Sequence, residues 1–144
     1  MTRKRDYSVE QANRTLPYVG TIVRELMERY ARIQSLSKEH HDTPRDHAEK
    51  RGRMRALMQE EAAALHACHQ ELQALGIELK DYEMGLVDFP ARIEGRTIHL
   101  CWKHGEPEIG HWHEVDAGFR GRHAVPAGEP GWPHKTTAAP ASQD

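Results

Sequence analysis

The spacing of apolar residues changes at Gly76, and this change constrains the fold more than any other feature of the chain. Before Gly76, two long stretches place apolar residues every three or four positions, which puts them on one face of a helix. After Gly76, short stretches alternate apolar and polar residues, as a strand with one buried face does. We therefore expect an α+β protein, with a long antiparallel α-helical hairpin followed by a small antiparallel β-module.

The helical hairpin is predicted over residues 8–76. Its two long helices are expected over residues 17–38 and about 46–75, each with an apolar stripe along one face. The polar, proline-containing residues 39–47 read as the connector between them. Two long helices joined by a short connector pack side by side in opposite directions.

Three residues are expected to set the ends of these helices. Ser8 followed by Gln11 has the pattern of a capping box, so a helix should begin there. Pro17 suits a first helical turn and disfavours helix just before it, so this first helix should break and a new one start. Gly76 suits the position just after the end of the hairpin's second helix.

The β-module is predicted over residues 77–124. Glu94-Gly95 is a good turn between two strands, which makes that part of the module a β-hairpin. Pro90 is expected to stop its strand or to push it to a sheet edge, because proline has no backbone N–H to donate. The expected strands are residues 77–80, 86–89, 97–102 and 109–113.

Length and composition restrict the classes of protein that this chain can belong to. At 144 residues we expect one domain, residues 1–124, followed by a disordered Pro-, Ala- and Gly-rich tail, residues 125–144. The net charge of −2 provides no field that attracts nucleic acid, and no apolar run is long enough for a membrane span. The charged N-terminus and two cysteines without a C-x-x-C motif predict a cytoplasmic protein with reduced thiols.

Side chains that commonly bind metals gather in the β-module. His99 and Cys101 are two positions apart on one expected strand, and His111 and His113 on another, so each pair shares a strand face. If these strands pair across the intervening turn, four donors meet, and His and Cys donors suit Zn²⁺ or Fe²⁺. Asp116 can add an oxygen ligand or orient an imidazole from outside the ligand set.

Two other roles stay open for the same residues. The chain contains 11 histidines, so these ones can be ordinary strand residues, and a buried cysteine often behaves as a small apolar side chain. Cys101 with a histidine and Asp116 also has the residue types of a Cys–His–Asp nucleophile. No cysteine-enzyme signature surrounds Cys101, which weakens this second alternative.

A glycine-rich segment, residues 118–122, carries two arginines and is a candidate anion site. The guanidinium groups of Arg120 and Arg122 and the flexible backbone N–H groups suit phosphate or carboxylate. The segment matches neither a phosphate-loop nor a dinucleotide-binding motif. The alternative is a tight turn whose arginine pairs with Asp88 or Asp116.

Several local motifs resemble one prokaryotic family, domain of unknown function 2203. They are YSVEQANRTLP at residues 7–17, GLVDFPA at 85–91, LCW at 100–102, GEP at 105–107 and WHEVDAGFRGR at 112–122. The resemblance covers roughly residues 6–123, including the helical hairpin by position. It implies a soluble prokaryotic protein with a shared architecture, and it implies no mechanism.

The leading functional hypothesis is a non-enzymatic cytosolic scaffold or accessory protein with a metal in its β-module. Cys101, His111 and His113 are its expected ligands, with His99 as the fourth candidate. The alternatives are a small metal-dependent enzyme that uses the same site and a protein-interaction module without a ligand. Because a lone hairpin buries only one seam, self-association through the helices is expected, and an unknown protein partner stays open.

Overall fold

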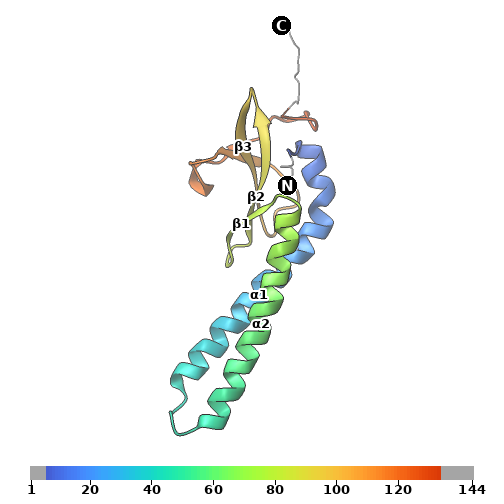
Figure 1. Ribbon diagram of the computed structural model, residues 1–144. Coiled ribbons are helices and arrows are strands. Elements are labelled where there is room, and N and C mark those ends of the chain that lie inside the picture. Colours follow the sequence, from blue (N-terminus) through green and yellow to red (C-terminus); the bar gives the residue numbers. More distant parts are fainter. Residues whose placement is uncertain (1–5, 134–144) are drawn as a thin grey trace.

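The computed structural model describes residues 6–133, which form a helical hairpin and one five-stranded sheet (Figure 1). The sheet stands at one end of the hairpin, whose other half projects away from it. The predicted α+β architecture is therefore confirmed. The elements are α1 (Val9–Asp42), α2 (Ala48–Ala74), β1 (Glu78–Asp81), β2 (Leu86–Ile93), β3 (Arg96–Lys103), β4 (His111–Glu114), a 3₁₀ turn η1 (Phe119–Gly121) and β5 (His123–Ala124).

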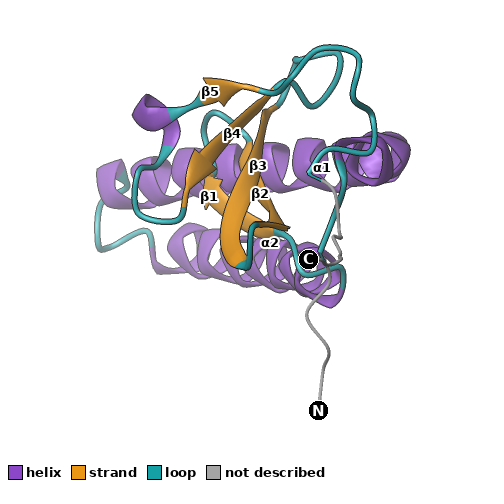
Figure 2. Ribbon diagram, turned by 90° about the horizontal axis from the view of Figure 1, so that it is seen from above, coloured by secondary structure: helices purple, strands orange, loops and turns teal. Residues whose placement is uncertain are grey.

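Helix α1 begins at the predicted cap and continues without a break through Pro17. The Ser8 side chain accepts from the backbone N–H of Gln11 at 3.2 Å, and the Gln11 side chain accepts from the Ser8 N–H at 3.0 Å. The break predicted at Pro17 is wrong, since α1 is one helix from Val9 to Asp42. Proline removes one helical hydrogen bond, and α1 changes direction after its first turns in both views (Figures 1 and 2).

The first turn of α1 is held by a segment from the far end of the chain. The backbone N–H groups of Val9 and Glu10 donate to the carbonyls of Trp132 and Pro130, each at 2.7 Å. Trp132 is itself buried in the core. The predicted boundary of the tail is therefore too early, because residues 125–133 belong to the fold. The rest of the predicted tail, residues 134–144, lies outside the described residues.

The connector between the helices is shorter than predicted. It spans residues 43–47, because α1 extends to Asp42. Arg51 of α2 explains this longer helix: its Nη1 donates to the carbonyls of His40 and Thr43 at 2.9 and 2.7 Å. The His40 carbonyl also accepts from the Thr43 N–H at 3.2 Å, and the side-chain donor adds to this cap of the last turn.

Helix α2 ends as predicted at a glycine. Gly76 has φ +77°, a conformation that glycine adopts at little cost. The Ile77 N–H donates to the Leu72 carbonyl and the Gly76 N–H to the Gln73 carbonyl, which together make a Schellman motif. Because Ile77 and Leu72 are both buried in the core, this turn also directs the chain from the hairpin into the sheet.

The sheet is an antiparallel meander in the order β1-β2-β3-β4-β5. Figure 2 shows its strands lying across the two helices. Side chains alternate between its two faces, and every second residue of β2 and β3 packs into the same core as the helices. This apolar face is formed by Val87, Phe89, Ala91, Ile98, Leu100 and Trp102.

Pro90 lies inside β2, which continues to Ile93. Strand β1 pairs only with residues 86–88 of β2, so at Pro90 the strand has β3 on one side and no strand of the described chain on the other. On that open side the Pro90 carbonyl accepts from the Tyr7 N–H at 2.8 Å. Of the two outcomes predicted for Pro90, the structure shows the local edge, where the missing N–H costs no ladder bond.

Candidate metal centre

The second face of the sheet carries a row of polar side chains from three adjacent strands. Asp88 of β2 lies opposite Cys101 of β3, which lies opposite His111 of β4. His99 of β3 lies opposite His113 of β4. Residues that pair across an antiparallel sheet share a face, so these five side chains project to the side away from the apolar core.

Three of these residues form a compact and fully buried group. Asp88, Cys101 and His113 each offer a ligand atom, and these atoms all lie within 4.8 Å of one another. Their exposed fractions are 2%, 0% and 2%. Ligand atoms around a tetrahedral Zn²⁺ are separated by roughly 3.5 Å, as bond lengths of about 2.0–2.3 Å require. The group is therefore close to the size of a metal site.

The contacts of His113 leave one position between its ring and Asp88 to be filled by a hydrogen or a metal ion. Its Nδ1 lies 2.6 Å from the Glu114 carbonyl, which only accepts, so Nδ1 carries a hydrogen. Its Nε2 lies 2.9 Å from Asp88 Oδ1. A neutral imidazole with its hydrogen on Nδ1 would direct a lone pair at that oxygen. Either a second proton or a metal ion must therefore separate Nε2 from the carboxyl group.

The other oxygen of Asp88 faces a second histidine, His99, without forming a hydrogen bond. Asp88 Oδ2 lies 3.3 Å from His99 Nδ1, but the orientation does not make a hydrogen bond, and both buried atoms remain without one. Burial raises the pKa of Asp88, but His99 and His113 outweigh it and leave that pKa below its ordinary value. Asp88 is therefore held as a carboxylate, the form that binds metals.

Cys101 is not activated as a nucleophile in this arrangement. Burial, with help from the Asp88 charge, raises the pKa of its thiol to about 12. Reactive cysteines instead have a lowered pKa and partial exposure. The Cys–His–Asp alternative is disfavoured on this ground, and a metal bound here would have to displace the thiol proton.

Three of the residues predicted as ligands, His99, His111 and Asp116, lie outside the compact group. His111 Nδ1 lies 2.9 Å from Arg122 Nη2, and because arginine only donates, that nitrogen accepts and is occupied. Asp116 lies exposed after β4. The structure thus brings together Cys101 and His113, with His99 beside them, and leaves His111 bound to an arginine.

The two arginines of the candidate anion segment have different environments. Arg120 is exposed. Arg122 is mostly buried and forms an ion pair with Glu106, at 2.9 Å. A carboxylate of the chain itself therefore occupies the guanidinium that an external anion would need, and this partner is neither Asp88 nor Asp116.

A comparison with family models identifies the group of proteins to which the chain is related. The model described as an uncharacterized conserved protein, DUF2203, matches residues 5–125. The chain belongs to the DUF2203 family. The resemblance seen in the sequence motifs is thereby confirmed. Neither a curated protein nor a solved structure matches the chain.

The DUF2203 match includes the hairpin and every residue of the polar face. Within residues 6–133, neither helix combines the length and apolar character that crossing a membrane requires. The one member of the compact group that sequence reasoning missed is Asp88. Its signal was a single carboxylate between Val87 and Phe89 in an otherwise apolar strand, which alternation places on the opposite face from both neighbours.

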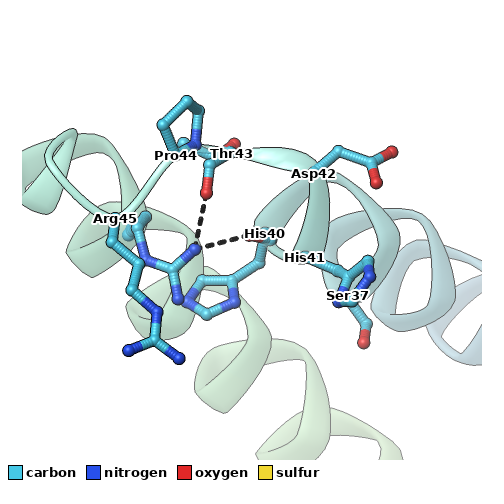
Figure 3. A pocket seen from close by; sticks show the side chains of 8 residues that line it. Ser37, His40, His41, Asp42, Thr43, Pro44 and Arg45 are labelled. Atoms are coloured by element: carbon cyan, nitrogen blue, oxygen red, sulfur yellow. Dashed lines mark hydrogen bonds between the residues drawn. The ribbon is translucent and has the colours of Figure 1, made fainter.

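A hollow of about 610 Å³ lies at the far end of the hairpin in this DUF2203 protein (Figure 3). The dashed lines mark the hydrogen bonds from Arg51 to the carbonyls at the end of α1. They serve the helix terminus, as described above. This hollow is remote from the sheet and contains no member of the polar face. It is lined by Ser37, His40, His41, Asp42, Thr43, Pro44, Arg45 and Arg51.

Proposed function

We propose that this protein is a cytoplasmic accessory or scaffold protein that binds one divalent transition metal in its sheet. The ligands are Asp88, Cys101 and His113, with His99 as the fourth. The donor set combines a carboxylate, a thiolate and imidazoles, which suits Zn²⁺ first and Fe²⁺ second. Both cysteines are free, which fits a reducing compartment.

The observation that carries this proposal is the orientation of His113. Histidine ligands commonly donate their second ring N–H to a backbone carbonyl, which fixes the tautomer and leaves the other nitrogen to the metal. His113 has this arrangement, with Nδ1 on the Glu114 carbonyl and Nε2 facing Asp88. Asp88 Oδ2 and His99 Nδ1, both buried and without a hydrogen bond, supply further donors at the same place.

The burial of the ligands favours a structural metal over a catalytic one. Structural zinc sites are closed by four protein ligands, whereas catalytic sites keep one position for water or substrate. Asp88, Cys101 and His113 are all buried. The enzymatic alternative requires an exchangeable water on the metal, which can be sought by spectroscopy of the Co²⁺-substituted protein.

Elemental analysis of the untagged full chain, purified without chelator, tests the proposal. We expect about one equivalent of one metal, retained in Cys68→Ala and lost in Cys101→Ala/His113→Ala. Cys68 is the matched control because it is also a free, buried cysteine but lies in the apolar core. Absence of bound metal in the parent protein, even after incubation with Zn²⁺ or Fe²⁺, would exclude the metal site.

Self-association through the hairpin is proposed as the scaffold function. Leu57 is 48% exposed and lines an apolar groove of about 470 Å³ together with Leu36 and Ala31. The groove lies on the half of the hairpin that the sheet does not cover, so a second hairpin packed there would bury a second seam. Sedimentation analysis should show a dimer that Leu57→Lys dissociates, whereas Met84→Lys, at another exposed apolar position, should leave it intact.

A further inference from the structure

A short segment rather than a helix lies on the side of the sheet that carries the polar face, and it is called the cover below. Residues 115–122, which include η1, connect β4 to β5 and lie on the side of the sheet away from α1 (Figure 1). Arg122 reaches from this segment to His111, the cross-strand neighbour of Cys101. Because the three ligand atoms are buried, an ion from solvent reaches them only if a neighbouring segment moves, and this segment is anchored beside Cys101 through His111.

Arg122 makes the contacts that hold the cover down. Its Nη2 donates to both Glu106 oxygens, at 3.0 and 2.9 Å, and its guanidinium lies 4.6 Å from the Phe119 ring centre. Glu106 is held in turn by the backbone N–H of Lys103 at 2.9 Å. One ion pair therefore joins the turn after β3 to the segment after β4, next to His111, which lies opposite Cys101.

The remainder of the cover is held weakly. Val115 is 54% exposed, and Arg120 is exposed as well. Gly118 has φ +69° and precedes η1, which has only three residues, and β5 after it has only two. A segment with few buried apolar contacts opens at low free energy. Within the described residues, the part-buried pair of Arg122 with Glu106 is the one ion pair that restrains it.

We propose that Arg122 and Glu106 form a latch that has to open before a divalent cation can reach Asp88, Cys101 and His113. This inference rests on the proposed metal function. It makes the ion pair a control on how fast the metal enters and leaves, while the ligands set how tightly it binds. Loss of a charged hydrogen bond gives about a tenfold change in such an opening equilibrium.

Two variants with opposite effects on charge separate a latch from simple electrostatics. Glu106→Gln removes a negative charge near the site, and Arg122→Met removes a positive one while keeping the aliphatic stem. If charge alone mattered, the first would slow Zn²⁺ capture and the second would accelerate it. A latch predicts that both variants capture Zn²⁺, and release it to a chelator, about tenfold faster than the parent.

The control variant is Glu61→Gln in the hairpin, which removes a carboxylate paired with Arg29 and Arg32 far from the sheet. Stopped-flow mixing of the full-length apoproteins with Zn²⁺ should give parent rates for this control. Rates that change in opposite directions in Glu106→Gln and Arg122→Met, or that do not change in either, would overturn the latch. Near-UV circular dichroism checks that each variant is folded. If Arg122→Met does not fold, Glu106→Gln alone still tests the latch, because charge alone predicts slower capture and the latch predicts faster capture.

A second measurement tests the latch in the absence of metal. In a Cys68→Ala background, the rate at which a neutral thiol reagent labels Cys101 in the apoprotein should rise in both variants. Removing Glu106 favours the thiolate and removing Arg122 disfavours it, so a common acceleration reports opening. Faster labelling in a protein that takes up no Zn²⁺ would leave the latch standing and exclude the metal function. Unchanged labelling and unchanged Zn²⁺ rates in a protein that binds Zn²⁺ would exclude the latch and leave the metal function standing.

Discussion

The two faces of the sheet come from the same strands but are buried in different ways. The face toward the helices is apolar and packs Phe89 and Leu100 against α1 and α2. The opposite face buries Asp88 and His113, and an ion pair between Arg122 and Glu106 joins two loops beside it. Apolar burial stabilises in proportion to area, whereas a buried charge stabilises only when it is fully partnered. The first face therefore accounts for the fold, and the second is where a function can be placed.

Truncation on the apolar face is expected to have the largest effect. Phe89 is fully buried and makes an edge-to-face contact with Tyr7 at 5.2 Å. Phe89→Ala should lower the free energy of unfolding by about 3–5 kcal/mol, the usual cost of a large cavity in a core. Phe119→Ala removes the same side chain from the cover on the other face, and urea unfolding should show a clearly smaller loss. Equal losses would mean that both faces contribute to the core alike.

An isosteric change on the polar face is expected to have the next largest effect. Asp88→Asn keeps the shape of the side chain and removes the charge that His113 and His99 face. In chelator-treated protein at neutral pH it should lower the free energy of unfolding by about 1.5–3 kcal/mol, the contribution of hydrogen bonds to a charged group. The double variant Asp88→Leu/His113→Leu should be more stable than Asp88→Leu alone, because it removes both polar partners together. A double variant that is less stable would show that His113 contributes independently of Asp88.

The contribution of Asp88 also has a defined pH dependence. The folded-state pKa of Asp88 lies below its ordinary value of 3.8, so the folded protein binds its proton less readily than the unfolded chain does. The stability it contributes is therefore complete above the unfolded value and is lost as the pH falls through the folded value. Urea unfolding of the apoprotein between about pH 5 and 2.5 should show the parent approaching Asp88→Asn as the pH falls. A constant difference between them over this range would contradict the lowered pKa.

The same contrast explains which features could be read from the sequence. The hairpin and the apolar strand faces follow from spacing alone, and strands β3 and β4 pair His99 with His113 as the metal hypothesis required. The contacts that hold the first turn of α1 could not be foreseen, because the carbonyls of Pro130 and Trp132 come from a distant part of the chain. Asp88 was missed for a related reason, since its partners lie on β3 and β4 and become neighbours only through the sheet register.

The smallest loss of stability is expected when either of the two cysteines is replaced in the absence of metal. Cys68 lies in the apolar core and Cys101 in the polar group, and both are free and buried. In chelator, Cys68→Ala and Cys101→Ala should each lower the free energy of unfolding by about 1 kcal/mol, close to the value of one buried methylene-sized group. With saturating Zn²⁺ only Cys101→Ala should fall further behind the parent, because a ligand that binds the folded state stabilises it in proportion to its affinity. Thermal melts with and without Zn²⁺ measure this difference. An equal response of both variants would show that the Cys101 thiol is not a metal ligand.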